Sequence, residues 1–180
     1  MPKIGLPCLL TVALYFAIAV TPVHCPVYAG QLPSGETFFE RSPFLTRAST
    51  NNNSAAYNIA RYSFEVRVPA DSGEPLGTLA ITLPSRAGRI TFPEPGMVSA
   101  VDGAGQPVPF KFQKDGQTFR LTFERPIPPG QRLTIQLYPM RNPRIGGRYA
   151  FAFEAAPAGP SPRAQFIGFG EFILIEGGGK

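Results

Sequence analysis

The sequence predicts an all-β protein, an antiparallel β-sandwich of immunoglobulin-like or related architecture with about eight strands. Two observations lead to this fold class. Apolar and polar residues alternate with a period of two along most of the chain after residue 60, which is typical of strands with one buried face. The chain also contains 21 prolines and 19 glycines, and no proline-free stretch keeps a helical apolar stripe.

Alternating apolar positions identify the individual strands. The expected strands centre on Tyr62–Val68, Leu79–Leu83, Ile90–Phe92, Val108–Phe112, Phe119–Phe123, Leu133–Leu137, Tyr149–Phe153 and Phe166–Ile175. Asp102-Gly103 and the segment 114–117 predict hairpin turns, because glycine tolerates positive φ. Short strands without βαβ spacing favour two antiparallel sheets packed face to face. The 15 phenylalanines are expected to supply most of the core.

The first 29 residues have the three parts of a secretory signal peptide. Lys3 gives a positive start, residues 4–20 are almost entirely apolar, and Ala29 is a small residue suited to cleavage. We therefore expect a secreted protein, located in the periplasm, the cell envelope or the extracellular space.

Three membrane-bound alternatives are disfavoured. An uncleaved anchor is less favoured than cleavage, since Pro7 and Pro22 shorten the apolar helix and no charged stop-transfer group follows. A lipoprotein anchor through Cys25 lacks a small residue before the cysteine, because His24 stands there. An outer-membrane barrel requires longer strands than these. The processed protein is expected not to be transmembrane.

Cleavage after Ala29 removes every imidazole and thiol from the protein. The only histidine, His24, and both cysteines, Cys8 and Cys25, lie in the leader. Serine–histidine and cysteine–histidine catalysis are thereby excluded, as are metal sites built on imidazole or thiolate. A calcium site at Asp71 and Glu74 is conceivable, but a solvated turn is the favoured reading. We expect no metal and no cofactor.

Composition divides the chain into four parts. Residues 1–29 are the signal peptide, 30–58 an extended N-terminal arm, 59–176 the β-sandwich domain and 177–180 a flexible tail. The arm is too apolar for a free linker, and we expect it to dock onto the domain through Phe38, Phe39, Phe44 and Leu45.

Two stretches carry a family resemblance. One is residues 62–76, with the turn Asp71-Ser72-Gly73-Glu74-Pro75. The other runs from Pro126-Ile127-Pro128-Pro129-Gly130 through residues 137–149 and ends at Gln165-Phe166-Ile167-Gly168-Phe169-Gly170. Together with the leader they resemble an exported cyanobacterial family catalogued as domain of unknown function 2808. The resemblance implies an exported, mostly β protein and transfers no activity. The same motifs have structural readings, namely a turn with Gly73 at positive φ and a bulge or close approach at Gly168 and Gly170.

Four arginines near the C-terminus are the candidate ligand-binding residues. Arg141, Arg144, Arg148 and Arg163 flank two connections, and no acidic residue occurs between Arg125 and Arg148. Guanidinium groups suit sulfate, carboxylate or phosphate on an anionic polysaccharide or lipid headgroup. A solvated set of loop arginines is the alternative reading. The net charge of +5 is modest, and we expect no nucleic-acid partner for an exported chain.

These observations favour an exported, non-catalytic β-sandwich module with a binding or structural role in the periplasm or cell envelope. Its expected partner is an envelope protein or an anionic glycan or lipid headgroup. The alternative is a carboxylate-dependent hydrolase of envelope carbohydrate, which would need two carboxyl groups facing each other across a groove.

Overall fold

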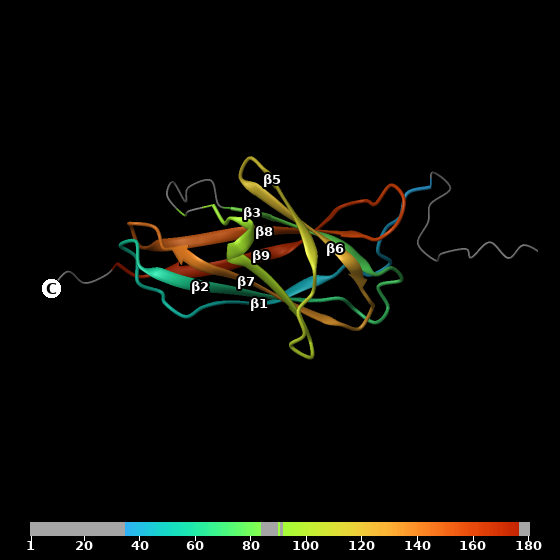
Figure 1. Ribbon diagram of the computed structural model, residues 1–180, viewed down its shortest axis with the longest axis horizontal. Helices are drawn as coiled ribbons and strands as arrows, with labels where there is room; N and C mark the ends of the chain where they lie inside the picture. Colours follow the sequence, from blue (N-terminus) through green and yellow to red (C-terminus); the bar gives the residue numbers. More distant parts are fainter. Residues whose placement is uncertain (1–34, 84–89, 91, 177–180) are drawn as a thin grey trace, which may run out of the picture.

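The protein is an antiparallel β-sandwich, as the sequence predicts. The structure is a computed structural model that describes residues 35–83, 90 and 92–176; the predicted signal peptide and C-terminal tail lie outside these residues. The described elements are β1 (Phe44–Thr50), β2 (Ile59–Arg67), β3 (Leu76–Thr82), the short 3-10 helix η1 (Pro95–Met97), β4 (Val98–Asp102), β5 (Phe110–Asp115), β6 (Thr118–Ile127), β7 (Arg132–Arg141), β8 (Gly147–Pro157) and β9 (Gln165–Leu174) (Figure 1). None of the helical structure within these residues is long and apolar enough to cross a membrane.

The strands form two sheets that face each other across one core. One sheet has the order β1-β2-β7-β4, and the other has the order β5-β6-β3-β8-β9. Phe64 of β2 lies with its ring centroid 4.8 Å from that of Phe153 and 5.4 Å from those of Phe151 and Phe172, all on the opposite sheet. Aromatic rings in such tilted arrangements stabilise a core beyond their buried area. Phenylalanine therefore holds the two sheets together, as expected.

The structure has a turn at both predicted positions, but only the second joins two paired strands. At the first, the positive φ lies at Gly105 (78°) and not at Gly103, and the flanking strands β4 and β5 belong to different sheets. Asp102 Oδ1 accepts hydrogen bonds from the backbone N–H groups of Ala104 (2.9 Å) and Gln106 (2.8 Å). Gly116 has a φ of 57° between the paired strands β5 and β6. The strand expected at Ile90–Phe92 was predicted wrongly, because Ile90 and Phe92 lie outside strands and β4 forms a few residues later. Both residues nevertheless pack on the core.

Two glycine predictions in β9 are confirmed. Gly168, with a φ of 135°, lies opposite Phe153 where the pairing of β8 and β9 shifts register. A Cβ atom on Gly170 would lie 2.7 Å from Cε1 of Phe64, so the backbone here approaches the core ring too closely for a side chain. The predicted positive φ of Gly73 is also present, at 75°.

The residues before the domain proper also pack on it. Phe39 is buried in the core, and Thr37 exchanges backbone hydrogen bonds with Ser161 (3.3 Å) and Arg163 (2.9 Å). Residues 44–50, within the predicted arm, form strand β1 along the edge of the four-stranded sheet. Phe44, expected to dock, is instead 41% exposed at the start of this strand.

Most of the strands run along the length of the molecule, so the connections between them gather at two ends (Figure 1). The connections 51–58 and 142–146 and the C-terminal segment 173–176 lie together at one end, which we call the arginine end (Figure 1, left). The connections 68–75, 128–131 and 158–164 and the lead-in 35–43 lie at the opposite end. Each candidate arginine therefore lies near one of these two ends.

Candidate functional site

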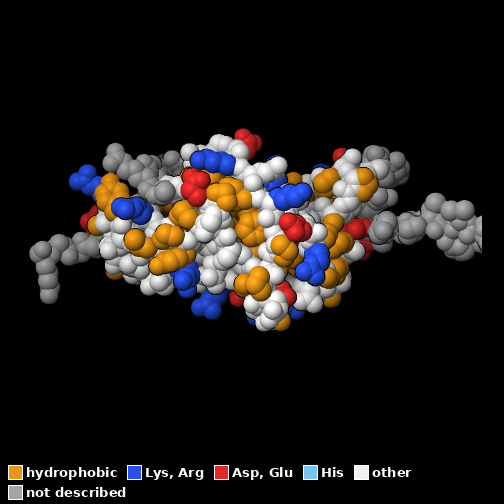
Figure 2. Space-filling view, viewed as in Figure 1, with side chains coloured by type: hydrophobic (Ala, Val, Ile, Leu, Met, Phe, Trp, Pro, Cys, Tyr) orange, Lys and Arg blue, Asp and Glu red, His pale blue; other side chains and the backbone are white. Residues whose placement is uncertain are grey.

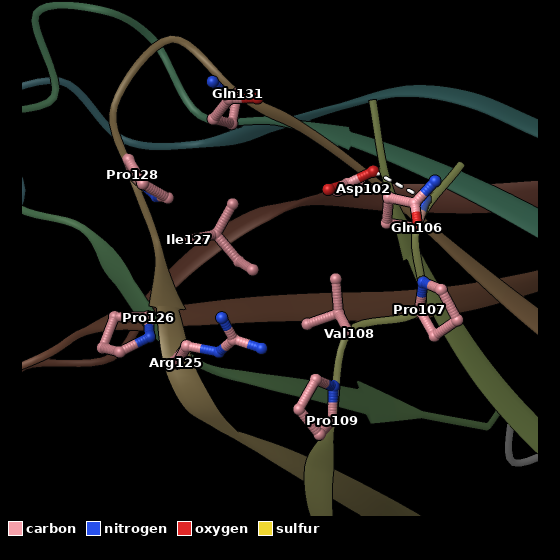
Figure 3. A pocket seen from close by; sticks show the side chains of 10 residues that line it. All are labelled: Asp102, Gln106, Pro107, Val108, Pro109, Arg125, Pro126, Ile127, Pro128 and Gln131. Atoms are coloured by element: carbon pink, nitrogen blue, oxygen red, sulfur yellow. Dashed lines mark hydrogen bonds between the residues drawn. The ribbon is translucent and has the colours of Figure 1, made fainter. Parts of the chain in front are cut away.

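A groove of about 540 Å³ lies between the β4–β5 connection and the end of β6. Ten residues line it: Asp102, Gln106, Pro107, Val108, Pro109, Arg125, Pro126, Ile127, Pro128 and Gln131 (Figure 3). Proline fixes its backbone φ, so the four prolines make the walls rigid before any ligand arrives. The volume is within the range of small-molecule sites.

The groove has one acidic and one basic residue. Asp102 is fixed by its two hydrogen bonds from backbone N–H groups, and Arg125 extends from the facing wall (Figure 3). Asp102 is its sole carboxylate. Hydrolysis of a glycosidic bond by general acid and base needs two, so this groove does not supply the pair that the hydrolase alternative requires.

A second, smaller hollow of about 250 Å³ lies on the outer face of the four-stranded sheet. Ser49, Ser63 and Gln136 stand side by side on β1, β2 and β7 in the strand register, and the two serines leave the face recessed. Its sole carboxylate, Glu65, forms a salt bridge of 3.2 Å with Arg132. This hollow also lacks a carboxylate pair.

The structure brings three of the four predicted arginines together. Arg141 ends β7, Arg144 lies in the connection that follows, and Arg148 is near the start of β8, all exposed at the arginine end. Arg163 lies in the β8–β9 connection at the opposite end. Strand β8, of 11 residues, separates the two connections. At about 3.3 Å per residue, that strand spans roughly 35 Å.

Exposed hydrophobic side chains accumulate beside these three arginines. Among the described residues, six of the nine large hydrophobic side chains that are exposed belong to the arginine end or the strand residues next to it: Tyr57, Ile59, Tyr138, Ile145, Ile173 and Ile175. Figure 2 shows hydrophobic and basic side chains side by side at this end of the molecule (left). Large exposed apolar patches on soluble domains mark interaction sites.

Backbone hydrogen bonds join the three segments of the arginine end. The N–H of Ala55 donates to the carbonyl of Ile175 (2.8 Å), and that of Ala56 donates to the carbonyl of Arg144 (3.2 Å). The N–H of Asn142 donates to the carbonyl of Asn58 (2.9 Å). The exposed side chains are therefore carried on a connected framework and not on independent loops.

A family model described as "Protein of unknown function (DUF2808)" matches residues 36–173. The chain belongs to this family. The match confirms the family expected from the sequence, whereas the cyanobacterial origin stays a prediction. No curated protein matches this DUF2808 chain.

Solved structures share the fold of this DUF2808 chain at low identity. An uncharacterized protein from Nocardia farcinica, described as having an immunoglobulin-like fold, is 15% identical with a TM-score of 0.44, covering 73% of this chain and 98% of that one. The major pilin subunit BcpA of Bacillus cereus is 9% identical with a TM-score of 0.49, covering 76% and 41%. The bacterial hydrophobin BslA is 17% identical with a TM-score of 0.41, covering 71% and 98%. These likenesses concern the fold alone.

The carboxylates considered for calcium lie at the opposite end. Asp71 forms a salt bridge of 3.1 Å with Arg41, and the hydrogen bond from this guanidinium lowers the pKa of Asp71. Glu74 is almost completely buried, and burial, followed by the nearby charge of Glu40, raises its pKa. Within the part of the chain that the structure describes, no three acidic residues are grouped so that they could hold a metal ion.

Sequence reasoning missed the hydrophobic members of the arginine end. Ile145 and Ile175 are 63% and 53% exposed, although isoleucine is usually buried. Ile145 lies between Arg144 and two glycines, a turn composition in which an isoleucine is out of place. That contrast is the one signal in the sequence that could have identified it.

Proposed function

We propose that this chain is an exported, non-catalytic binding module of the cell envelope, which holds an anionic envelope component at the arginine end. The observation that carries the proposal is the grouping of Arg141, Arg144 and Arg148 with exposed hydrophobic residues on one connected framework. The expected ligand bears phosphate, sulfate or carboxylate groups, which guanidinium forks bind well.

The local charges support an anionic ligand. Arg148 reaches Glu171 at 3.1 Å, but this pair is exposed and therefore weak. Within the described part of the chain, neither Arg141 nor Arg144 forms a salt bridge. Both guanidinium groups are thus available to a ligand.

The proposal is tested by sedimentation binding to anionic vesicles and to an acidic polysaccharide. The protein begins at Gly30, because every residue of the described core lies between Phe39 and Leu174, and its thermal unfolding is recorded first. The variant carries R141A, R144A and R148A. An arginine near an anionic surface contributes about 1 kcal/mol, so binding is expected to weaken roughly 100-fold.

Arg163 provides a matched control from the same chain. R163A removes an exposed arginine at the opposite end, and R120A removes one from the outer face of the five-stranded sheet. Both are expected to bind like the parent. Absence of binding by the parent to both the vesicles and the polysaccharide, or equal losses in all variants, contradicts the proposal.

A further inference from the structure

We propose that the arginine end docks on the surface of an anionic lipid bilayer and inserts isoleucine side chains into its apolar region. This inference rests on the proposed function and names the physical form of its ligand. Three observations carry it: the aliphatic chemistry of the exposed residues, their grouping at one end of the molecule, and the tyrosines and arginines around them.

The exposed residues require an apolar phase. Ile145, Ile173 and Ile175 are 63%, 65% and 53% exposed and come from two of the joined segments. An aliphatic side chain neither hydrogen-bonds nor stacks like an aromatic ring on a sugar, so a soluble polysaccharide offers it much less apolar contact than the acyl region of a bilayer does. Transfer into the acyl boundary of a bilayer is favourable for every buried methylene group.

The arrangement suits a fluid partner better than a folded one. Ile145 lies in the 142–146 connection, Ile173 at the end of β9 and Ile175 just after it, all at one end of the elongated molecule. None of the three lines either of the two hollows. Figure 1 shows these segments at the left end of the ribbon. A protein partner needs a surface of matching shape at such a site. A fluid bilayer adapts to exposed side chains without a surface of matching shape.

Tyrosine and arginine complete the composition of a bilayer interface. Tyr57 and Tyr138 are 38% and 48% exposed, and the guanidinium of Arg61 lies 4.8 Å from the centroid of the Tyr138 ring. Tyrosine is enriched at membrane–water interfaces, and arginine keeps its charge at the headgroups while its stem covers apolar surface. Arg141 and Arg144 would meet the lipid phosphates.

The turn that presents Tyr57 is held in an unusual conformation. Ala56 and Tyr57 have φ values of 60° and 61°, a left-handed conformation that non-glycine residues seldom adopt. Such strain persists where the surrounding structure imposes it and is concentrated at ligand-binding sites. Here the N–H of Ala56 is bonded to Arg144, so the strain and the basic residues belong to one framework.

The chain contains no tryptophan, so a single substitution provides a clean fluorescent reporter. Ile145→Trp places it at the arginine end, and Phe166→Trp is the matched control, since Phe166 is 54% exposed at the start of β9, near the opposite end. Each protein, beginning at Gly30, is mixed with vesicles of phosphatidylglycerol and phosphatidylcholine. Parallel vesicles contain lipids brominated in the acyl chains.

The inference predicts that Ile145→Trp emission shifts to shorter wavelength and is quenched by the brominated lipids, while Phe166→Trp emission is unchanged. The double variant I145S/I175S, with its unfolding temperature recorded, is expected to bind vesicles at least about tenfold more weakly, because two apolar side chains no longer insert. Its binding to the acidic polysaccharide is expected to be unchanged.

Vesicle binding without quenching overturns the insertion of isoleucine side chains but leaves the proposed function intact. Binding to the polysaccharide alone has the same two consequences. A spectral change of Ile145→Trp with envelope proteins but not with lipid assigns this surface to a protein partner and overturns the inference. Absence of binding to both vesicles and polysaccharide overturns the inference and the proposed function together.

Discussion

The hydroxyl of Tyr62 donates a hydrogen bond of 2.5 Å to Oδ1 of Asn142, and both side chains are fully buried. The Nδ2 group of Asn142 donates in turn to the carbonyls of Asn52 (3.0 Å) and Ser54 (2.7 Å). Tyr62 also stacks on Phe172, with centroids 4.6 Å apart. These contacts connect the aromatic core directly to two segments of the arginine end. Burial raises the pKa of Tyr62, so the phenol stays protonated and remains a donor.

Removal of either partner is expected to destabilise the protein. Tyr62→Phe leaves Oδ1 of Asn142 buried without its donor, which costs about 1–3 kcal/mol of unfolding free energy. Asn142→Ala is expected to cost more, because it also leaves the carbonyls of Asn52 and Ser54 without this donor. Urea unfolding of both single variants and of the double variant measures the coupling. Additive losses would mean that the two side chains do not act as a pair.

Gly170 is expected to tolerate no side chain. A methyl group there would contact the Phe64 ring, which other core rings surround, and Gly170→Ala is therefore expected to cost about 1–3 kcal/mol. Gly96→Ala is the control, since no atom lies within 4 Å of its added Cβ position. Equal unfolding temperatures of the two variants would contradict the packing described for β9.

The strained turn can be relieved by one substitution. A left-handed conformation costs a non-glycine residue roughly 1–2 kcal/mol, whereas glycine adopts it freely. Ala56→Gly is therefore expected to raise the unfolding free energy by about 0.5–1 kcal/mol after its entropic cost. The same change at Ala48 in β1 is expected to lower it. A loss of stability in both variants would show that the turn is not strained.

Glu74 is expected to make stability depend on pH. Its pKa is raised in the folded protein, so the folded state holds this proton more tightly than the unfolded chain does. The resulting stability is fully present below the unfolded pKa of about 4.3 and is lost as pH rises through the folded value. Glu74→Gln cannot lose a proton, and its advantage over the parent should grow across this range.

Thermal unfolding of Glu74→Gln and the parent at several pH values tests this prediction. Glu124→Gln, at an exposed strand position, controls for the loss of one negative charge. A stability difference that is constant with pH, or one that shrinks as pH rises, would contradict the assigned direction.

The sequence predicted those parts of the fold that depend on local periodicity. Alternation identifies both β2 and β6, because one face of each strand packs on the core. In β9, glycine occurs where the backbone approaches the ring of Phe64. Strand β1 was not predicted, because an edge strand with little burial shows no alternation. The order of strands in each sheet depends on which distant strands pair with each other, and a local sequence pattern does not show this.

The grouping of the candidate site residues could also be predicted only where it depends on nearness in the sequence. Arg141, Arg144 and Arg148 are close in sequence and border one connection, so grouping them required no knowledge of topology. Arg163 follows after the whole of β8, and a strand of that length moves it to the opposite end. The contribution of Ile175 depends on its pairing with residues 53–55, which tertiary structure alone reveals.

Binding of the arginine end to a bilayer can be located residue by residue through amide chemical-shift mapping of the protein beginning at Gly30 as anionic bicelles are added. Docking by the arginine end is expected to shift only the amides of residues 51–59, 138–149 and 171–176, and these shifts should reverse when salt screens the arginines. Shifts centred on the proline-walled groove or on the connection that carries Arg163 would contradict it.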